Sequence, residues 1–260
     1  MAKYFKHLRY FLVLAIFNVF IFSICSANSK NSAAENLNSE EISIRSFDET
    51  TIDVVLKKSK IKQEPVFIFV NDYQEKKEKW EPLVQQIANR NFSVIQYDLR
   101  EFSAFARGSR KLENNDYEYR PAYFLQDLDK IVLFLDINHG IKNNQIVLIG
   151  AGLGANIVLK FAAGNKDIKS VILIAPKKEE KQVSTKAAIR SYGDRPIMFL
   201  SSMNDKESYD TCLDYMSYLS RNKNVRLKFY YFDKDKKPMD FLQEKMVLDD
   251  IMDWIGKYYK

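Results

Sequence analysis

The sequence predicts a three-layer α/β fold, in which a mostly parallel sheet of about eight strands lies between two layers of helices. An antiparallel hairpin is expected at its N-terminal edge, and no large lid is expected. Three observations support this prediction. Short runs of β-branched and aromatic residues alternate with segments of helical periodicity, most of these runs are apolar at every position, and a glycine-rich turn joins one run to a helix.

The predicted strands begin with a hairpin, because residues 42–45 and 52–56 lie on either side of a short polar turn. Antiparallel edge strands often open such sheets. The later runs are continuously apolar, as strands buried on both faces should be. They span residues 66–70, 94–97, 146–149, 171–174, 197–200 and 225–231.

The predicted helices carry one apolar stripe each. Within residues 80–88, apolar side chains recur at the i, i+3, i+4 and i+7 spacing of a single helix face. The same spacing occurs within 124–135, 212–219 and 248–255, and another helix is expected to begin at Ala155. We expect each stripe to pack against the sheet.

The first 27 residues have the layout of a signal peptide. Basic residues precede an apolar run over residues 10–25, and small residues follow it. The run is short for a membrane-spanning helix and contains Asn18, so cleavage before Asn28 is favoured over a permanent anchor. The sequence therefore predicts a signal peptide over residues 1–27.

Cys25 leaves an alternative open, in which it becomes the lipidated first residue of a bacterial lipoprotein. Ile24 is bulky where that signal usually has a small residue, so simple cleavage is the preferred prediction. In both cases the protein is expected in the periplasm, in the cell envelope or outside a bacterium. Residues 28–40 are polar and predict a flexible tether, and residues 41–260 form the predicted domain.

Charge and cysteine content exclude several classes of function. Loss of the first 27 residues removes Lys3, Lys6 and Arg9 and lowers the formal net charge from +6 to +3. The remaining lysines are mixed with acids, which is typical of a solvated surface and not of a nucleic-acid site. Cys212 and Cys25 are too few for a disulfide framework or a cysteine metal site. We expect no cofactor or metal, a small molecule or a protein as partner, and membrane contact only through the signal or a lipid anchor.

The glycine-rich turn is Gly150-Ala151-Gly152-Leu153-Gly154, between a predicted strand and a predicted helix. In the motif G-x-S-x-G, a nucleophile stands at a sharp strand-to-helix turn, and the small flanking residues let strand and helix approach. Gly150 and Gly154 meet that requirement. The middle residue, Gly152, stands where the reaction needs a nucleophilic side chain.

With this motif the chain resembles the α/β-hydrolase family, in its dienelactone-hydrolase and serine-aminopeptidase-like branch, over about residues 42–258. Residues 65–72 are similar to the family's strand before the oxyanion loop. Residues 94–100 look like the strand that ends in Asp-x-Arg-Gly, and residues 192–198 look like the approach to the strand that carries the catalytic acid.

The resemblance assigns three catalytic positions. The nucleophile position is Gly152, which has no side chain, and the acid position is Asp205, where the residue type is kept. The histidine position lies near Lys236, and no histidine occurs there. After export the remaining histidine is His139, which is expected at the opposite end of the sheet. An exposed lysine stays protonated, so Lys236 is a poor substitute base.

The oxyanion side of the site corresponds to Asn71, Asp72 and Leu153. Asn71-Asp72 stands in place of the family's His-Gly. A carboxylate there would repel a developing oxyanion, where the reaction needs hydrogen-bond donors. The favoured hypothesis is therefore an exported, non-catalytic α/β-hydrolase-like protein that binds a ligand or partner.

Aromatic and basic residues gather in the segment after Arg100, which the fold would place beside the former active site. Tyr117, Tyr119 and Arg120 are the candidate binding residues there, because tyrosine and arginine are favoured in recognition surfaces. A loop that packs its own aromatic side chains is the alternative explanation.

Two other functions stay open. The first is an atypical serine-type hydrolase of ester or peptide bonds, with Ser103, Ser201 or Ser202 near strand ends. The second is a nucleotide-binding protein. Gly150, Gly152 and Ala155 match G-x-G-x-x-A, a weak dinucleotide fingerprint that here lacks the usual acid after the next strand.

Overall fold

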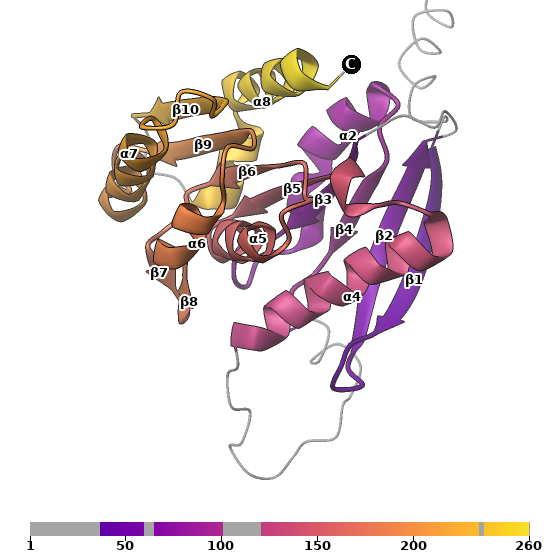
Figure 1. Ribbon diagram of the computed structural model, residues 1–260. Coiled ribbons are helices and arrows are strands. Elements are labelled where there is room, and N and C mark those ends of the chain that lie inside the picture. Colours follow the sequence, from indigo (N-terminus) through magenta and orange to yellow (C-terminus); the bar gives the residue numbers. More distant parts are fainter. Residues whose placement is uncertain (1–36, 60–64, 101–120, 234–236, 260) are drawn as a thin grey trace, which may run out of the picture.

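An eight-stranded sheet forms the centre of the molecule in the computed structural model, which describes residues 37–59, 65–100, 121–233 and 237–259 (Figure 1). The order of the strands is β1-β2-β4-β3-β5-β6-β9-β10. Their bounds are β1 Leu37–Arg45, β2 Thr51–Ser59, β3 Val66–Val70, β4 Val94–Tyr97, β5 Ile146–Ala151, β6 Ser170–Ile174, β9 Ile197–Ser202 and β10 Leu227–Phe232.

The sheet confirms the predicted mixture of strand directions. β1 and β2 form an antiparallel hairpin, β2 pairs antiparallel with β4, and every later pairing is parallel. The domain starts earlier than the expected boundary at Glu41. Leu37 already pairs with Ser59, so the first residues of β1 belong to the hairpin and not to the tether.

Helices cover both faces of the sheet. On one face α2 and α8 pack over a core that includes Phe67, Ile149 and Ile172, and on the other face α4, α5, α6 and α7 pack over Ile68, Leu148 and Leu173 (Figure 1). The alternation of side chains along buried strands supplies both cores. The helices are η2 Lys77–Trp80, α2 Glu81–Asn89, α4 Pro121–His139, η3 Asn143–Gln145, α5 Leu153–Gly164, α6 Lys186–Ser191, α7 Lys206–Leu219, η4 Pro238–Gln243 and α8 Lys245–Tyr258.

The segment between β6 and β9 is small. It holds the two-residue strands β7 Glu179–Glu180 and β8 Val183–Ser184, followed by α6. The Asn156 side chain of α5 holds this hairpin by donating to the carbonyl of Val183 over 2.9 Å. These short elements are all that the chain forms between β6 and β9. Within the described residues, no helix is long and apolar enough to cross a membrane.

Candidate functional site

Gly152 forms the turn between β5 and α5. Its φ and ψ are 52° and −121°, a conformation that a residue with a side chain adopts only with strain. Its N–H donates to the carbonyl of Ile174 over 2.9 Å, and its own carbonyl accepts from Ala155 and Asn156. The predicted strand-to-helix elbow is therefore present, with a glycine at its apex.

The flanking glycines allow the close approach that the motif requires. A Cβ on Gly150 would lie 2.3 Å from the carbonyl oxygen of Gly154. A Cβ on Gly154 would lie 2.2 Å from the carbonyl oxygen of Val70. Backbone blocks both positions, and backbone cannot rotate away as a side chain can, so α5 could not pack this closely on β3 and β5 with larger residues.

Asp72 fills the space above the elbow. A Cβ added to Gly152 would lie 2.0 Å from Oδ1 of Asp72 and 2.2 Å from its Cγ. The same Oδ1 accepts hydrogen bonds from the backbone N–H of Leu153, over 2.9 Å, and from that of Tyr73, over 2.7 Å. The carboxylate therefore occupies the position of a nucleophilic side chain and binds the N–H group that follows it in the motif.

This contact refines the expectation for the oxyanion side. The sequence indicates that an acid at position 72 would repel an oxyanion. That expectation assumes that the nearby backbone N–H donors are unoccupied. In the structure the N–H of Leu153 is already engaged by Asp72. Preorganised N–H donors stabilise a reacting oxygen only when that oxygen can reach them. Sequence reasoning missed the direction of this side chain, which follows from the missing Cβ of Gly152.

Burial raises the pKa of Asp72, and the hydrogen bonds from Leu153 and Tyr73 together with the charge of Lys177 only partly oppose the shift. Burial also raises the pKa of Glu180, and the negative charge of Asp72 adds to this effect. Oε2 of Glu180 is buried and accepts no hydrogen bond from the described residues. The charge of Asp72 thus disfavours the ionised form of Glu180.

Lys177 is the cation of this cluster. Its Nζ lies 3.8 Å from Glu180 and 3.7 Å from Glu207. Burial acts to lower the pKa of Lys177, but the charges of Glu180, Glu207, Asp205 and Asp72 outweigh it and raise the pKa. Lys177 therefore holds its proton and is unsuited to act as a general base. The described residues contain no group of acids, histidines or cysteines arranged to hold a metal ion.

Asn71 is fully buried and turned away from the elbow. Its amide donates to Oδ1 of Asp98 over 3.0 Å and to the carbonyl of Glu75 over 3.2 Å. Its side-chain oxygen accepts from Nε1 of Trp80 over 2.6 Å. This network ties the end of β3 to η2, which ends at Trp80, and to Asp98 just after β4. The Asn71 side chain therefore positions the strand end, and its amide is engaged by Asp98 and Glu75.

Asp205 is the N-cap of α7. Its carboxylate accepts from the N–H of Ser208 over 3.2 Å, which satisfies one of the free donors of the first helical turn. The nearby serines are also engaged, since Oγ of Ser201 bonds to Oγ of Ser208 and Oγ of Ser202 accepts from the N–H of Asn204. Helix capping therefore explains the presence of an acid at position 205.

Several predicted site residues lie outside the described residues. They are Cys25, Ser103, Tyr117, Tyr119, Arg120 and Lys236. His139 is described, and it ends α4 just before η3 and β5, where its ring packs against Phe134 at a centroid distance of 5.5 Å. Since β5 runs from this end towards Gly152, His139 lies at the end of the sheet opposite the elbow, as the sequence predicts.

The dinucleotide fingerprint has the predicted strand-turn-helix setting, with Gly150 and Gly152 before α5 and Ala155 within it. A phosphate would bind at the N-terminus of that helix. The carboxylate of Asp72 already stands there and accepts from Leu153. A phosphate would meet a like charge at this position, so the geometry opposes nucleotide binding.

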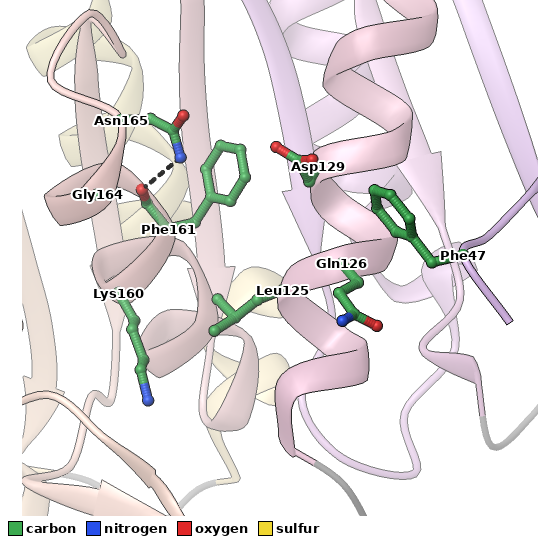
Figure 2. Close-up of a pocket in the computed structure, with 8 residues that line it drawn as sticks. All are labelled: Phe47, Leu125, Gln126, Asp129, Lys160, Phe161, Gly164 and Asn165. Carbon is green, nitrogen blue, oxygen red and sulfur yellow. Dashed lines mark hydrogen bonds between the residues drawn. The ribbon is translucent and has the colours of Figure 1, made fainter.

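A separate shallow cavity of about 340 Å³ lies between α4 and α5 (Figure 2). Its lining mixes apolar side chains, such as Leu125 and Phe161, with polar ones. The full lining is Phe47, Leu125, Gln126, Asp129, Lys160, Phe161, Gly164 and Asn165. None of these residues belongs to the predicted catalytic positions.

Comparison with known proteins finds similarity in fold but not in sequence. No protein-family model matches the chain, and no curated protein matches it. Solved structures do match. An esterase from Pyrococcus furiosus superimposes with a TM-score of 0.66 at 12% identity, covering 86% of this chain and 92% of the esterase.

Two further structures give the same result. Dienelactone hydrolase from Anabaena variabilis has a TM-score of 0.63 at 13% identity and covers 86% of this chain and 100% of its own. The esterase domain of a Rhodothermus marinus protein has a TM-score of 0.60 at 14% identity and covers 85% and 99%. Identities this low establish the architecture alone. The sheet order, the elbow at Gly152 and these structures together show that this chain has the α/β-hydrolase fold.

Proposed function

We propose that this protein is an exported, non-catalytic member of the α/β-hydrolase fold that binds a ligand or a protein partner. The observation that carries the proposal is the position of Asp72. Its carboxylate fills the space of the nucleophile's side chain and accepts the Leu153 N–H that would stabilise a developing oxyanion.

The chemistry of ester or peptide cleavage supports the non-catalytic half of the proposal. Cleavage through a covalent intermediate needs an attacking group, and direct hydrolysis needs a base to activate water. Gly152 supplies no attacking group. Oδ1 of Asp72 accepts from two backbone N–H groups, and the neighbouring Lys177 holds its proton.

The retained fold supports the binding half. Loop and strand-end residues that meet at the C-terminal edge of a parallel sheet commonly form binding surfaces. At this edge Lys177 lies among carboxylates that include Glu180 and Glu207. We therefore expect the partner to contact the former active-site face, and export follows from the signal-like layout of residues 1–27.

An in-cell photo-crosslinking experiment tests the binding half. A photoreactive amino acid replaces Met203, which is 42% exposed and follows β9 at the former active-site edge. The matched control replaces Asp167, which is exposed in the turn before β6 at the opposite edge. We expect a discrete crosslinked species from position 203 alone. Equal crosslinking at both positions, or none at either, contradicts a partner-binding face at this edge.

The second candidate is an atypical hydrolase, favoured by the esterases among the similar structures. Turnover of short p-nitrophenyl esters separates the two functions. The proposal expects no turnover above buffer from the wild type. Turnover that a Ser201→Ala or Ser202→Ala variant abolishes would favour the atypical hydrolase instead.

A further inference from the structure

The outer edge of β10 is open. β10 ends the strand order of the sheet, and no strand in the described part of the chain pairs with its outer side. On its inner side, the carbonyls of Arg226 and Phe232 accept from the N–H groups of Ile197 and Met203. These bonds fix which residues of the strand face β9.

In a parallel pair, successive residues direct their backbone groups to alternate sides of the strand. Since Arg226 and Phe232 face β9, the N–H and C=O groups of Leu227, Phe229 and Tyr231 face outward. Unpaired backbone groups of this kind form a template for another strand. The outward groups thus define which registers a pairing strand can adopt.

The side chains of the edge are aromatic and poorly protected. Tyr231 is 56% exposed and forms a cluster with Phe229 and Tyr209, with ring centroids 5.7–5.9 Å apart. Natural edge strands are usually blocked by proline, a bulge or charge. Residues 227–232 contain no proline, and their single charge, Lys228, lies over its own chain's Tyr230 ring at 4.6 Å.

We propose that β10 pairs antiparallel with β10 of a second copy, about a two-fold axis at Phe229, so that the two sheets join in a closed dimer. In an antiparallel ladder, outward residues must face outward residues. With Phe229 opposite its own copy, Leu227 faces Tyr231 of the second copy, and each outward backbone group gains a partner.

The charges in this register are complementary to the opposing side chains. On the other face of the sheet, Lys228 faces Tyr230 of the second copy, which adds a cation–aromatic contact. Asp250 of α8 interacts electrostatically with Lys228, which offsets repulsion between the two lysines across the axis. Within residues 227–232 no like charges stand directly opposite each other, and a two-fold axis closes the assembly at two copies. These features favour a second copy over an unrelated strand.

Sedimentation analysis of the purified protein over a wide concentration range tests the dimer. We expect a monomer–dimer equilibrium that Tyr231→Pro eliminates, because proline removes an outward N–H that β9 does not use. The matched control, Tyr231→Ala, keeps that N–H and raises the dissociation constant by at most about thirtyfold. A wild type that stays monomeric throughout, or a dimer that Tyr231→Pro leaves unchanged, overturns the proposal.

Cysteine crosslinking tests the register, with the wild type as background because Cys212 is buried. Directly opposed residues have Cα atoms about 5.5 Å apart, within reach of a disulfide. Phe229→Cys should therefore form an oxidised dimer, whereas Tyr231→Cys should not, because Tyr231 faces Leu227 of the second copy. Efficient crosslinking of Tyr231→Cys without Phe229→Cys overturns the register. Circular dichroism of each variant shows that it is folded.

Discussion

Gly152→Ser should be clearly destabilising, through two costs that the structure separates. The backbone conformation at this position costs about 1–3 kcal/mol for a residue with a side chain. The new Cβ would also stand 2.0 Å from Oδ1 of Asp72, so the carboxylate must leave the N–H groups of Leu153 and Tyr73. Loss of such charged hydrogen bonds costs about 1.5–3 kcal/mol.

A double-mutant cycle measures the second cost. In an Asp72→Ala background the collision is absent, so Gly152→Ser should cost only the backbone strain, and the two changes should couple by about 2 kcal/mol. Urea unfolding of the wild type, both single variants and the double variant gives the four free energies. Equal costs of Gly152→Ser in the two backgrounds would refute the contact between Asp72 and the elbow. No variant in the cycle should gain esterase activity, because no histidine is supplied.

Two further outcomes follow from the structure, and a third follows from the sequence. Arg100→Ala should lower the free energy of unfolding by about 3–5 kcal/mol, because it leaves the buried Asp127 carboxylate unpaired, whereas Arg45→Ala, in an exposed pair, should change it by less than about 1 kcal/mol in the same urea titrations. Because burial raises the pKa of Asp72 above 3.8, the folded state keeps the proton longer than the unfolded state, so the wild type should lose stability relative to Asp72→Asn as pH rises above that value. A relative gain with rising pH would contradict this. Intact mass of the exported protein should match a chain that begins at Asn28, and a diacylated mass beginning at Cys25 would reveal the lipoprotein route.

The buried strands could be predicted closely from the sequence, because continuous apolar runs mark them. Residues 66–70 and 94–97 match β3 and β4 at both ends. Other strands differ at their ends: β5 and β9 end two residues later than predicted, and β10 begins at Leu227 and not at residue 225. Val225 instead donates to the carbonyl of Asn222 in the preceding turn. A backbone hydrogen bond in the turn sets the start of β10, and the apolar character of the sequence does not predict such a bond.

The lengths of the helices and the small β7–β8 hairpin were harder to predict from the sequence. α4 extends from Pro121 to His139, but the apolar stripe within residues 124–135 marks only its buried part. The end turns are mostly solvated and therefore carry no apolar pattern that would predict them. The β7–β8 hairpin gave no sequence signal, since two-residue strands depend on tertiary contacts such as that of Asn156 with Val183. Contacts of this kind appear only once the chain is folded.

The candidate site divides in the same way. The motif identifies Gly152 as the apex and Gly150 and Gly154 as close contacts, because their roles follow from backbone geometry. The occupant of the site could not be predicted. Asp72 and Leu153 are 81 residues apart, and their hydrogen bond depends on the absent side chain of Gly152. An acid next to the oxyanion loop is a signal of altered chemistry, but the direction of its side chain is a property of the fold.

The central proposal is that Asp72 fills the space above the elbow at Gly152 and that the site contains no reactive nucleophile. The most direct test is the intact mass of the purified protein after exposure to a fluorophosphonate, with an active serine esterase as the positive control. The claim predicts an unchanged mass for this protein under conditions that fully label the esterase. Stoichiometric addition of one phosphonyl group to a serine of the wild type would contradict it.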